Sequence, residues 1–240
     1  QMANIKRNCI KGHIKDGFVK PENAGTSCCI FGDCITDVDV ICCSFREPRV
    51  EKPRLLLHSC CGPCSTAVIE RLIGTYKITV FYYNPNIHDE AEYEKRKRNQ
   101  IDFINQLNDS NIYEDKIEFT EGEYDTESFF KVSAGLEEEN EGVARCEKGF
   151  RLRLERTAVH AKTHGFDTFA TTLTVSPYKN YKLITEIGRG LAFKYQLSYL
   201  DTDFKKKDGY KRSIELSKQY GLYRQHYCGC IYSLLKSGSD

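Results

Sequence analysis

The chain has 240 residues, of which 40% are hydrophobic and 29% are charged, and its formal net charge is +1. This length and composition fit one globular domain with a sizeable core and exclude a disordered chain. No apolar run approaches the roughly 20 residues that a membrane-spanning helix needs, and the first residues lack a secretory signal pattern, so we expect a cytoplasmic protein with no membrane partner. A net charge near zero means that any RNA binding must come from local clusters of Lys and Arg.

Residues 1–50 differ from the rest of the chain. Six cysteines are scattered there among Gly, Asn, Asp and Pro, without a helical or strand period: Cys9, Cys28, Cys29, Cys34, Cys42 and Cys43. Their spacing does not match a paired zinc ribbon, which favours an irregular extension over a small metal-binding appendage. We therefore predict an irregular, cysteine-containing N-terminal extension of unknown role at 1–50 and a folded domain at 51–240.

From residue 53 onward, short apolar runs alternate with longer amphipathic segments. This alternation is typical of a parallel sheet covered by helices. We predict strands at 55–58, 78–83, 117–120, 168–173 and 197–200, and two of the helices by their apolar stripes. One helix follows Asp89 as its N-cap and carries Ile101, Ile104 and Leu107; the other carries Phe150, Leu154, Ala158 and Ala161. The predicted class is a single α/β domain with a mainly parallel sheet flanked by helices.

Unusual residues follow the end of each predicted strand. In chain order they are Cys60, Cys61 and Cys64, then Asn84-Pro85-Asn86, then residues 121–124, then Ser176-Pro177-Tyr178, and finally Asp203. The carboxyl ends of parallel strands share one edge of a sheet, and ligands bind in the crevice beyond that edge. We therefore expect one functional site there.

The chain contains twelve cysteines, and without an export signal their tight groups indicate metal binding rather than disulfides. Cys60, Cys61 and Cys64 lie in a strand-to-helix turn, where the helix start favours thiolates. Cys146 and the pair Cys228 and Cys230 bring the total to six outside the extension, which exceeds the four ligands of one iron-sulfur cluster or one zinc site. A second metal is therefore possible.

Two other interpretations stay open at this point. A non-catalytic zinc site could pin the C-terminal segment to the first loop and stabilise an RNA-binding module. Alternatively, Cys61 and Cys64 match a thioredoxin-type dithiol motif of a thiol-disulfide oxidoreductase. Against the dithiol, Cys60 stands where thioredoxins have an aromatic residue, and Cys228 and Cys230 have no role in such an enzyme.

Residues 52–233 resemble the cobalamin-independent, QueH-type epoxyqueuosine reductases. The matching blocks, in order, are LLLHSCCGPCS (55–65), FYYNPNI (81–87), EYEKR (92–96), RLRLERTA (151–158), TTLTVSPYKN (171–180), DFKKKDGYKRSIELS (203–217) and LYRQHYCGCIYS (222–233). The resemblance implies a nucleotide-hydrolase-like (HUP-like) catalytic domain with metals at the C-terminal ends of the strands. It also implies reduction of epoxyqueuosine to queuosine at the wobble position of tRNA.

The resemblance implies two metal groups, a [4Fe-4S] cluster and a single iron beside it. The residues that match the metal-binding positions of the family are Cys60, Cys61, Cys64, Cys146, Cys228, Cys230 and Asp203. One position departs from the family, because Gly149 stands where a second cysteine is usual after Cys146. Water, Asp203 or a cysteine of the extension would have to replace that thiol, or the second iron is lost or weakly held.

Removing an epoxide oxygen takes two electrons and two protons, so an electron-donor protein or reductant is also expected. Asp203, Tyr178 and His226 are candidate proton donors, since each lies in a segment expected near the crevice.

Candidate tRNA contacts gather near the C-terminus, where cations can meet phosphates and an aromatic ring can stack on a base: Lys205, Lys206, Lys207, Tyr210, Lys211, Arg212 and Arg224. A second basic group, Arg151, Arg153 and Arg156, is expected on the exposed side of its helix.

Overall fold

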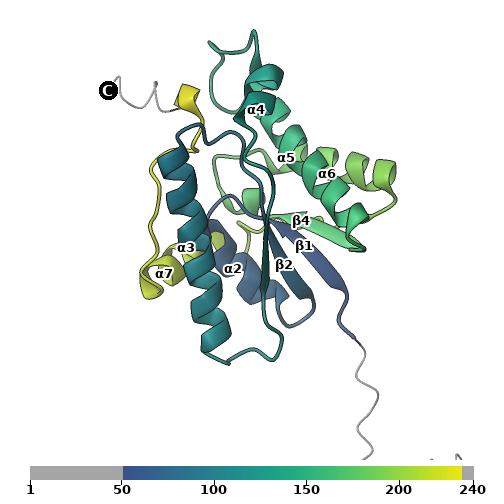
Figure 1. The fold of residues 1–240 in the computed structure, drawn as a ribbon, viewed down its shortest axis with the longest axis vertical. Helices are drawn as coiled ribbons and strands as arrows, with labels where there is room; N and C mark the ends of the chain where they lie inside the picture. The colour runs from purple at the N-terminus through teal and green to yellow at the C-terminus, as the bar shows by residue number, and fades with distance from the viewer. Residues whose placement is uncertain (1–50, 234–240) are drawn as a thin grey trace, which may run out of the picture. The chain divides into compact units, whose positions relative to one another are not determined.

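The computed structural model describes residues 51–233, and the expected N-terminal extension lies outside the described residues. Five strands form one all-parallel sheet, as expected (Figure 1). They are β1 (Arg54–His58), β2 (Lys77–Tyr82), β3 (Glu118–Glu121), β4 (Thr168–Thr171) and β5 (Ser198–Tyr199), in the spatial order β3-β2-β1-β4-β5. Strand β1 is central, so its Leu57 is level with Val80 of β2 on one side and Ala170 of β4 on the other.

Helices cover both faces of this sheet because β1 is apolar on both. Leu55 and Leu57 face a core shared with α2 (Gly62–Leu72) and α3 (Glu90–Asp109). Leu56 faces the opposite core, which is shared with α5 (Ala144–Thr163) and α6 (Tyr181–Tyr195). Helix α7 (Gly209–Gln219) packs on α2, and α4 (Thr126–Ser133) packs on α5. The two predicted apolar stripes are confirmed as core, except that Ile101 is only half-buried.

The strand order places a crevice at the expected edge. The chain runs from β1 outward through β2 to β3, then returns to the other side of β1 for β4 and β5. Open parallel sheets bind ligands where the order reverses in this way, here beyond the carboxyl ends of β1 and β4. The loop that carries Cys60, Cys61 and Cys64 begins at that point.

Several element boundaries differ from the expectation, mostly by one residue, and the end of the fourth strand differs for a local reason. The fourth strand ends at Thr171 rather than at residue 173, because the Thr171 side chain accepts a hydrogen bond from the Leu173 amide and starts a 3-10 turn, η3 (Thr172–Val175). Strand β5 keeps only Ser198 and Tyr199. Cys146, expected just before its helix, lies inside the first turn of α5.

Among the described residues, no helix is long and apolar enough to cross a membrane.

Candidate metal centre

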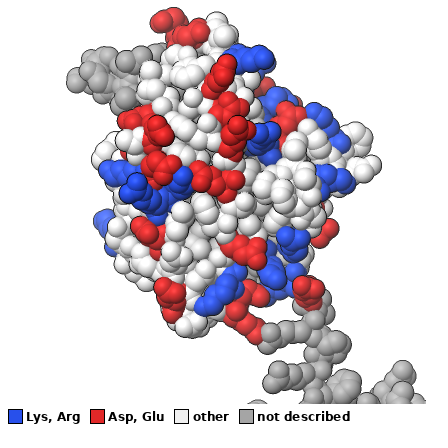
Figure 2. Space-filling model, viewed as in Figure 1, with Lys and Arg blue, Asp and Glu red and all other residues white. Residues whose placement is uncertain are grey.

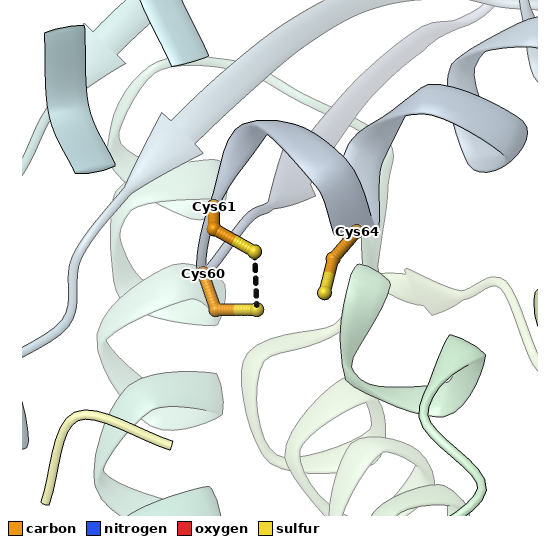
Figure 3. A group of neighbouring side chains, drawn as sticks. All are labelled: Cys60, Cys61 and Cys64. Atoms are coloured by element: carbon orange, nitrogen blue, oxygen red, sulfur yellow. Dashed lines mark hydrogen bonds between the residues drawn. The ribbon is translucent and has the colours of Figure 1, made fainter. Parts of the chain in front are cut away.

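The first cysteine loop, defined as residues 59–64, gathers three thiols between β1 and α2. Cys61 is the extended N-cap of α2, Pro63 lies in the first turn, and Cys64 follows on that turn. The sulfur atoms of Cys60, Cys61 and Cys64 all lie within 4.8 Å of one another, and Figure 3 shows them turned toward one another. Such a group of buried, soft donors fits a thiophilic metal or an iron-sulfur cluster.

Hydrogen bonds among these thiols concentrate negative charge on Cys60. Hydrogen bonds from the Cys61 and Cys64 thiols hold the pKa of Cys60 well below its usual range, and the positive charge of Lys179 acts in the same direction. The same hydrogen bond raises the pKa of Cys61 to about 12, and hydrogen bonds to Cys60 and Cys61 raise the pKa of Cys64. These hydrogen bonds therefore favour a thiolate at Cys60, and the thiolate is the form in which a cysteine binds a metal.

Buried hydrogen bonds fix the loop to the sheet. His58 is fully buried at the end of β1, with Nδ1 2.9 Å from Thr171 Oγ1 and Nε2 3.1 Å from the Tyr83 carbonyl oxygen. Since a carbonyl only accepts, Nε2 carries the proton and Nδ1 accepts from the hydroxyl. Burial lowers the pKa of His58 to about 4, so the ring is neutral near pH 7. Asn84 donates to the Ser59 carbonyl oxygen at 2.9 Å and ties the loop to the end of β2.

A second group of thiols shares a small cavity with Cys60. Cys146, Cys228 and Cys230 line this cavity of ≈ 60 Å³ together with Cys60. A hydrogen bond from Cys230 lowers the pKa of Cys228 to about 6 and raises that of Cys230, while burial raises the pKa of Cys146. Members of all three cysteine groups thus line one cavity, and their role as metal ligands stays a prediction.

One contact joins the C-terminal segment to the first cysteine loop. The Gln225 side-chain amide donates to Cys61 Sγ at 3.0 Å, although the two residues are 164 positions apart in the chain. The side-chain amide oxygen of Gln225, Oε1, is buried and has no hydrogen-bond partner among the described residues. A buried acceptor without a partner marks a place where a ligand with a donor group would fit.

Four cationic side chains line the same cavity: Arg96, Arg145, Arg153 and Lys179. Arg153 is buried, and its Nε donates to the Gly149 carbonyl oxygen at 2.9 Å, so the expectation that Arg153 lies on the exposed side of its helix is wrong. Burial lowers the pKa of Arg153, and nearby thiolates such as Cys60 and Cys228 partly oppose that effect. Burial also acts to lower the pKa of Lys179, but the charges of Cys60 and Cys64 outweigh it and raise the pKa. Arg153 and Lys179 therefore both place positive charge beside the thiols.

Gly149, where a second cysteine of the α5 pair was expected, lines the cavity too. A Cβ atom there would lie 3.2 Å from the Phe129 ring and 3.9 Å from Arg153 Nη2. The Phe129 ring thus takes up the space next to this glycine, and no thiol is supplied from this position.

The three candidate proton donors differ in their exposure and in whether they line the cavity. Tyr178 lines the cavity and is 80% exposed, so it stands at the cavity mouth. Asp203 follows β5 and is largely buried; its carboxylate lies 3.4 Å from Lys205 Nζ, and it is not among the residues that line the cavity. His226 is exposed and also lies outside the lining. Their roles in proton transfer stay predictions.

The candidate tRNA contacts differ in how exposed they are and in whether they already have a partner within the protein. Lys206, Lys207 and Lys211 are exposed, and Lys205 is half-buried. Arg212 donates to Glu70 at 2.7 Å and Tyr210 packs against the core, so neither is as available as the sequence suggests. Arg224 donates to Ser217 at 3.3 Å. On the face shown in Figure 2, cationic and anionic side chains are interspersed, so local clusters rather than one large basic surface would have to meet phosphates.

Sequence reasoning missed several residues around the cavity. Arg96 and Arg145 line it and are buried, and Gln225 and Lys179 line it as well. A signal was present for three of them, because Arg96, Lys179 and Gln225 lie in blocks that match the family. Periodicity alone cannot separate a buried arginine from an exposed one on a polar helix.

Comparisons with known proteins agree with this site. The family model described as Epoxyqueuosine reductase QueH matches residues 55–236. A protein named Epoxyqueuosine reductase QueH from Staphylococcus epidermidis is 43% identical over 192 residues, covering 79% of this chain and 80% of the relative. Proteins of the same name from Streptococcus pyogenes and Thermotoga maritima are 41% and 36% identical, covering 81% and 76% of this chain and 75% and 91% of their own lengths.

Proposed function

The chain belongs to the QueH family of epoxyqueuosine reductases, and from this we propose that its six described cysteines hold the metal centre with which it reduces epoxyqueuosine to queuosine in tRNA. The observation that carries the proposal is the convergence of the first cysteine loop with Cys146, Cys228 and Cys230 at the reversal point of the sheet. Three donor segments far apart in sequence meet where a substrate would bind.

Cys60, Cys61 and Cys64 would supply three ligands to a [4Fe-4S] cluster, and one thiol of the second group would supply the fourth. The remaining thiols, with Asp203 as the acidic candidate, would hold a second iron. When bound, these groups supply electrons one at a time and polarise the epoxide oxygen. Because Gly149 supplies no side-chain ligand, we expect the second iron to be held less firmly than the cluster.

The chain's own residues prepare the cavity for this reaction. Arg153 and Lys179 offset the negative charge of several thiolates in a buried place, where unpaired charge is unfavourable. Tyr178 at the cavity mouth can stack on an extruded base or give a proton to the oxygen that leaves as water. Asp203 and His226 would need the tRNA or the metals to bring them into reach.

The dithiol alternative has less support from the site. A dithiol enzyme uses two thiols, but here the sulfur atom of Cys60 lies within 4.8 Å of those of Cys61 and Cys64 and makes a group of three. We therefore favour the metal centre at the end of β1. The all-parallel sheet, with thiols in the turn after β1, supports the nucleotide-hydrolase-like arrangement that the resemblance implies.

The test is to purify and reconstitute the protein without oxygen, and to measure iron, zinc, acid-labile sulfide and turnover of tRNA that carries epoxyqueuosine. We expect about four irons with matching sulfide for the cluster, with any further iron reporting on the second site, and queuosine in the nucleosides of the product. Zinc without sulfide, in a protein that leaves the tRNA unchanged, would contradict the proposal.

A further inference from the structure

The segment that carries Cys228 and Cys230 has no regular secondary structure to hold it. Residues 222–230 form neither helix nor strand, yet Cys230 and Gly229 are buried. Backbone carbonyls that lack a helix or sheet partner need other donors when they are buried. The question is which side chains place this segment against the first cysteine loop.

Arg96 of α3 provides those donors. Its side chain is 1% exposed; Nη1 donates to the Cys228 carbonyl oxygen at 3.2 Å, and Nη2 donates to the Tyr227 carbonyl oxygen at 3.2 Å. The guanidinium carbon also lies 5.1 Å from the centroid of the Tyr227 ring. A second donor comes from Asn86, whose amide reaches the Cys228 carbonyl oxygen at 3.3 Å. The planar fork of Arg96 thus binds two consecutive carbonyls next to a candidate metal ligand.

Glu92, one turn earlier on α3, orients that fork. Arg96 Nε donates to Glu92 Oε1 at 2.6 Å, and the Glu92 side chain is only 10% exposed. The Tyr223 hydroxyl donates to Glu92 Oε2 at 3.1 Å, so the start of the C-terminal segment is fixed by the same carboxylate. Removing one partner of a buried ion pair leaves the other uncompensated. Glu92 and Arg96 therefore act as one unit.

The backbone at Gly229 fits closely against this unit. Gly229 has φ +98, and a Cβ atom there would lie 2.6 Å from Ile87 Cγ1 and 3.1 Å from Arg96 Nη1. Only glycine combines this conformation with such a close approach. The sequence Cys228-Gly229-Cys230 is thus shaped to pass directly over Arg96.

We propose that Arg96, oriented by Glu92, is the positioning residue that docks the Cys228-Gly229-Cys230 segment onto the first cysteine loop. The inference about docking stands on the contacts of these residues, and its consequence for metal binding rests on the proposed function. Arg96 does not touch the reacting atoms in this role; it acts through Cys228 and Cys230.

The first test measures docking without any metal. In reduced, metal-free protein, each cysteine is labelled with an alkylating reagent and its rate is followed by mass spectrometry. In Arg96→Met we expect Cys228 and Cys230 to react about tenfold faster, while Cys64 changes little, because local opening of the segment exposes only its own thiols. Arg98→Met, on an exposed position of the same helix, should match the wild type.

Arg96→Lys sharpens the test and guards against a variant that does not fold. Lysine keeps a buried positive charge for Glu92 but cannot bind two carbonyls with a fixed fork, so Cys228 and Cys230 should react at an intermediate rate. Wild-type rates at these two cysteines in a folded Arg96→Lys protein would overturn the proposal. A uniform rise at all six cysteines would overturn it as well, since that result indicates general loosening.

A cobalt experiment separates this inference from the metal centre. Co²⁺ bound by thiolates gives an absorption band that grows with the number of sulfur ligands. We expect Cys228→Ser, which removes one of the six described thiols, to lower the band by roughly a sixth, and Arg96→Met, which loosens Cys228 and Cys230, to lower it by up to about a third. If Cys228→Ser leaves the band unchanged while Arg96→Met still speeds alkylation, docking stands and the metal role of this segment fails. If Cys228→Ser lowers the band but Arg96→Met does not speed alkylation of Cys228 and Cys230, the metal role stands and docking by Arg96 is rejected.

Discussion

The two cysteine regions of this protein are positioned by different means. The first cysteine loop is built into the fold, since it continues the central strand β1 and starts α2. His58, just before the loop, and Ser59, its first residue, are fully buried and hydrogen-bonded to the adjoining strand ends. The C-terminal segment at residues 222–230 has no strand or helix, and side chains of α3 hold it in place. The position of the first group thus depends on the core, and that of the second on a few polar contacts.

This difference predicts two kinds of response to mutation. Changes to the buried side chains that support the first loop, such as His58, should affect the stability of the whole domain, because their hydrogen bonds lie in the core. Changes near the C-terminal segment should affect local opening and metal content while the domain stays folded. Four variants test this contrast, from the largest expected effect to the smallest.

Cys60→Ser should have the largest effect. Cys60 belongs to the three-thiol group and also lines the cavity shared with Cys228 and Cys230, so its loss removes a ligand from the meeting point of both groups. We expect no detectable turnover of epoxyqueuosine-containing tRNA and a clear fall in bound iron and sulfide. Serine is nearly isosteric, so thermal unfolding of the metal-free protein should stay close to the wild type. Thr163→Ala, at an exposed position of α5, is the control, and full iron content in Cys60→Ser would contradict the ligand role.

His58→Leu should destabilise the whole domain. The substitution leaves the Thr171 hydroxyl and the Tyr83 carbonyl without their buried partner, which should lower the free energy of unfolding by about 3 kcal/mol. Urea denaturation of the metal-free protein measures this change. His164→Leu, at an exposed position, is the matched control and should change stability by less than about 0.5 kcal/mol. Equal effects of the two variants would show that the first loop does not depend on the core.

Gly229→Ala should act locally. The positive φ and the close approach to Ile87 make alanine unfavourable, so the segment should open and Cys230 should be alkylated roughly tenfold faster. The free energy of unfolding should fall by less than in His58→Leu. Gly74→Ala is the control, because a Cβ atom at Gly74 meets nothing within 4 Å. A global loss of stability as large as that of His58→Leu would remove the contrast between the two regions.

Tyr178→Ala should have the smallest structural effect, since this side chain is 80% exposed. Loss of one stacking partner should raise the KM for tRNA by about tenfold, without a change in unfolding. Phe193→Ala removes another exposed aromatic ring, 91% exposed and outside the cavity, and should leave KM unchanged. Tyr178→Phe then separates two roles: a normal KM with a lower kcat indicates proton transfer, while normal values of both indicate stacking alone.

Much of the fold could be predicted from the sequence because its signals are local. The run Leu55, Leu56 and Leu57 reads as a strand buried on both faces, and the structure confirms it at the centre of the sheet. The end of β4 could not be predicted in this way, because residues 172–173 are as apolar as the strand itself. A hydrogen bond from the Leu173 amide to the Thr171 side chain decides that boundary.

The cysteines of the site stand out in the sequence, but the residues that support them do not. Cysteines are rare and chemically distinctive, and the strand order places the first cysteine loop at the reversal point of the sheet. The residue types of Arg96 and Arg153 are less distinctive, since arginine on a charged helix is usually exposed. The burial of Arg96 depends on contacts with residues more than a hundred positions away, such as Cys228.

The distance in sequence between the two cysteine regions has a consequence for biosynthesis. Cys60 is made early and Cys228 late, so a growing chain carries the thiols of the first cysteine loop long before it carries those of the C-terminal segment. A metal taken up by the loop at that stage would lack the ligands that the proposed function assigns to Cys228 and Cys230. On that proposal we expect loading to follow translation, so delayed addition of iron to finished apoprotein should yield as much cluster as addition during synthesis.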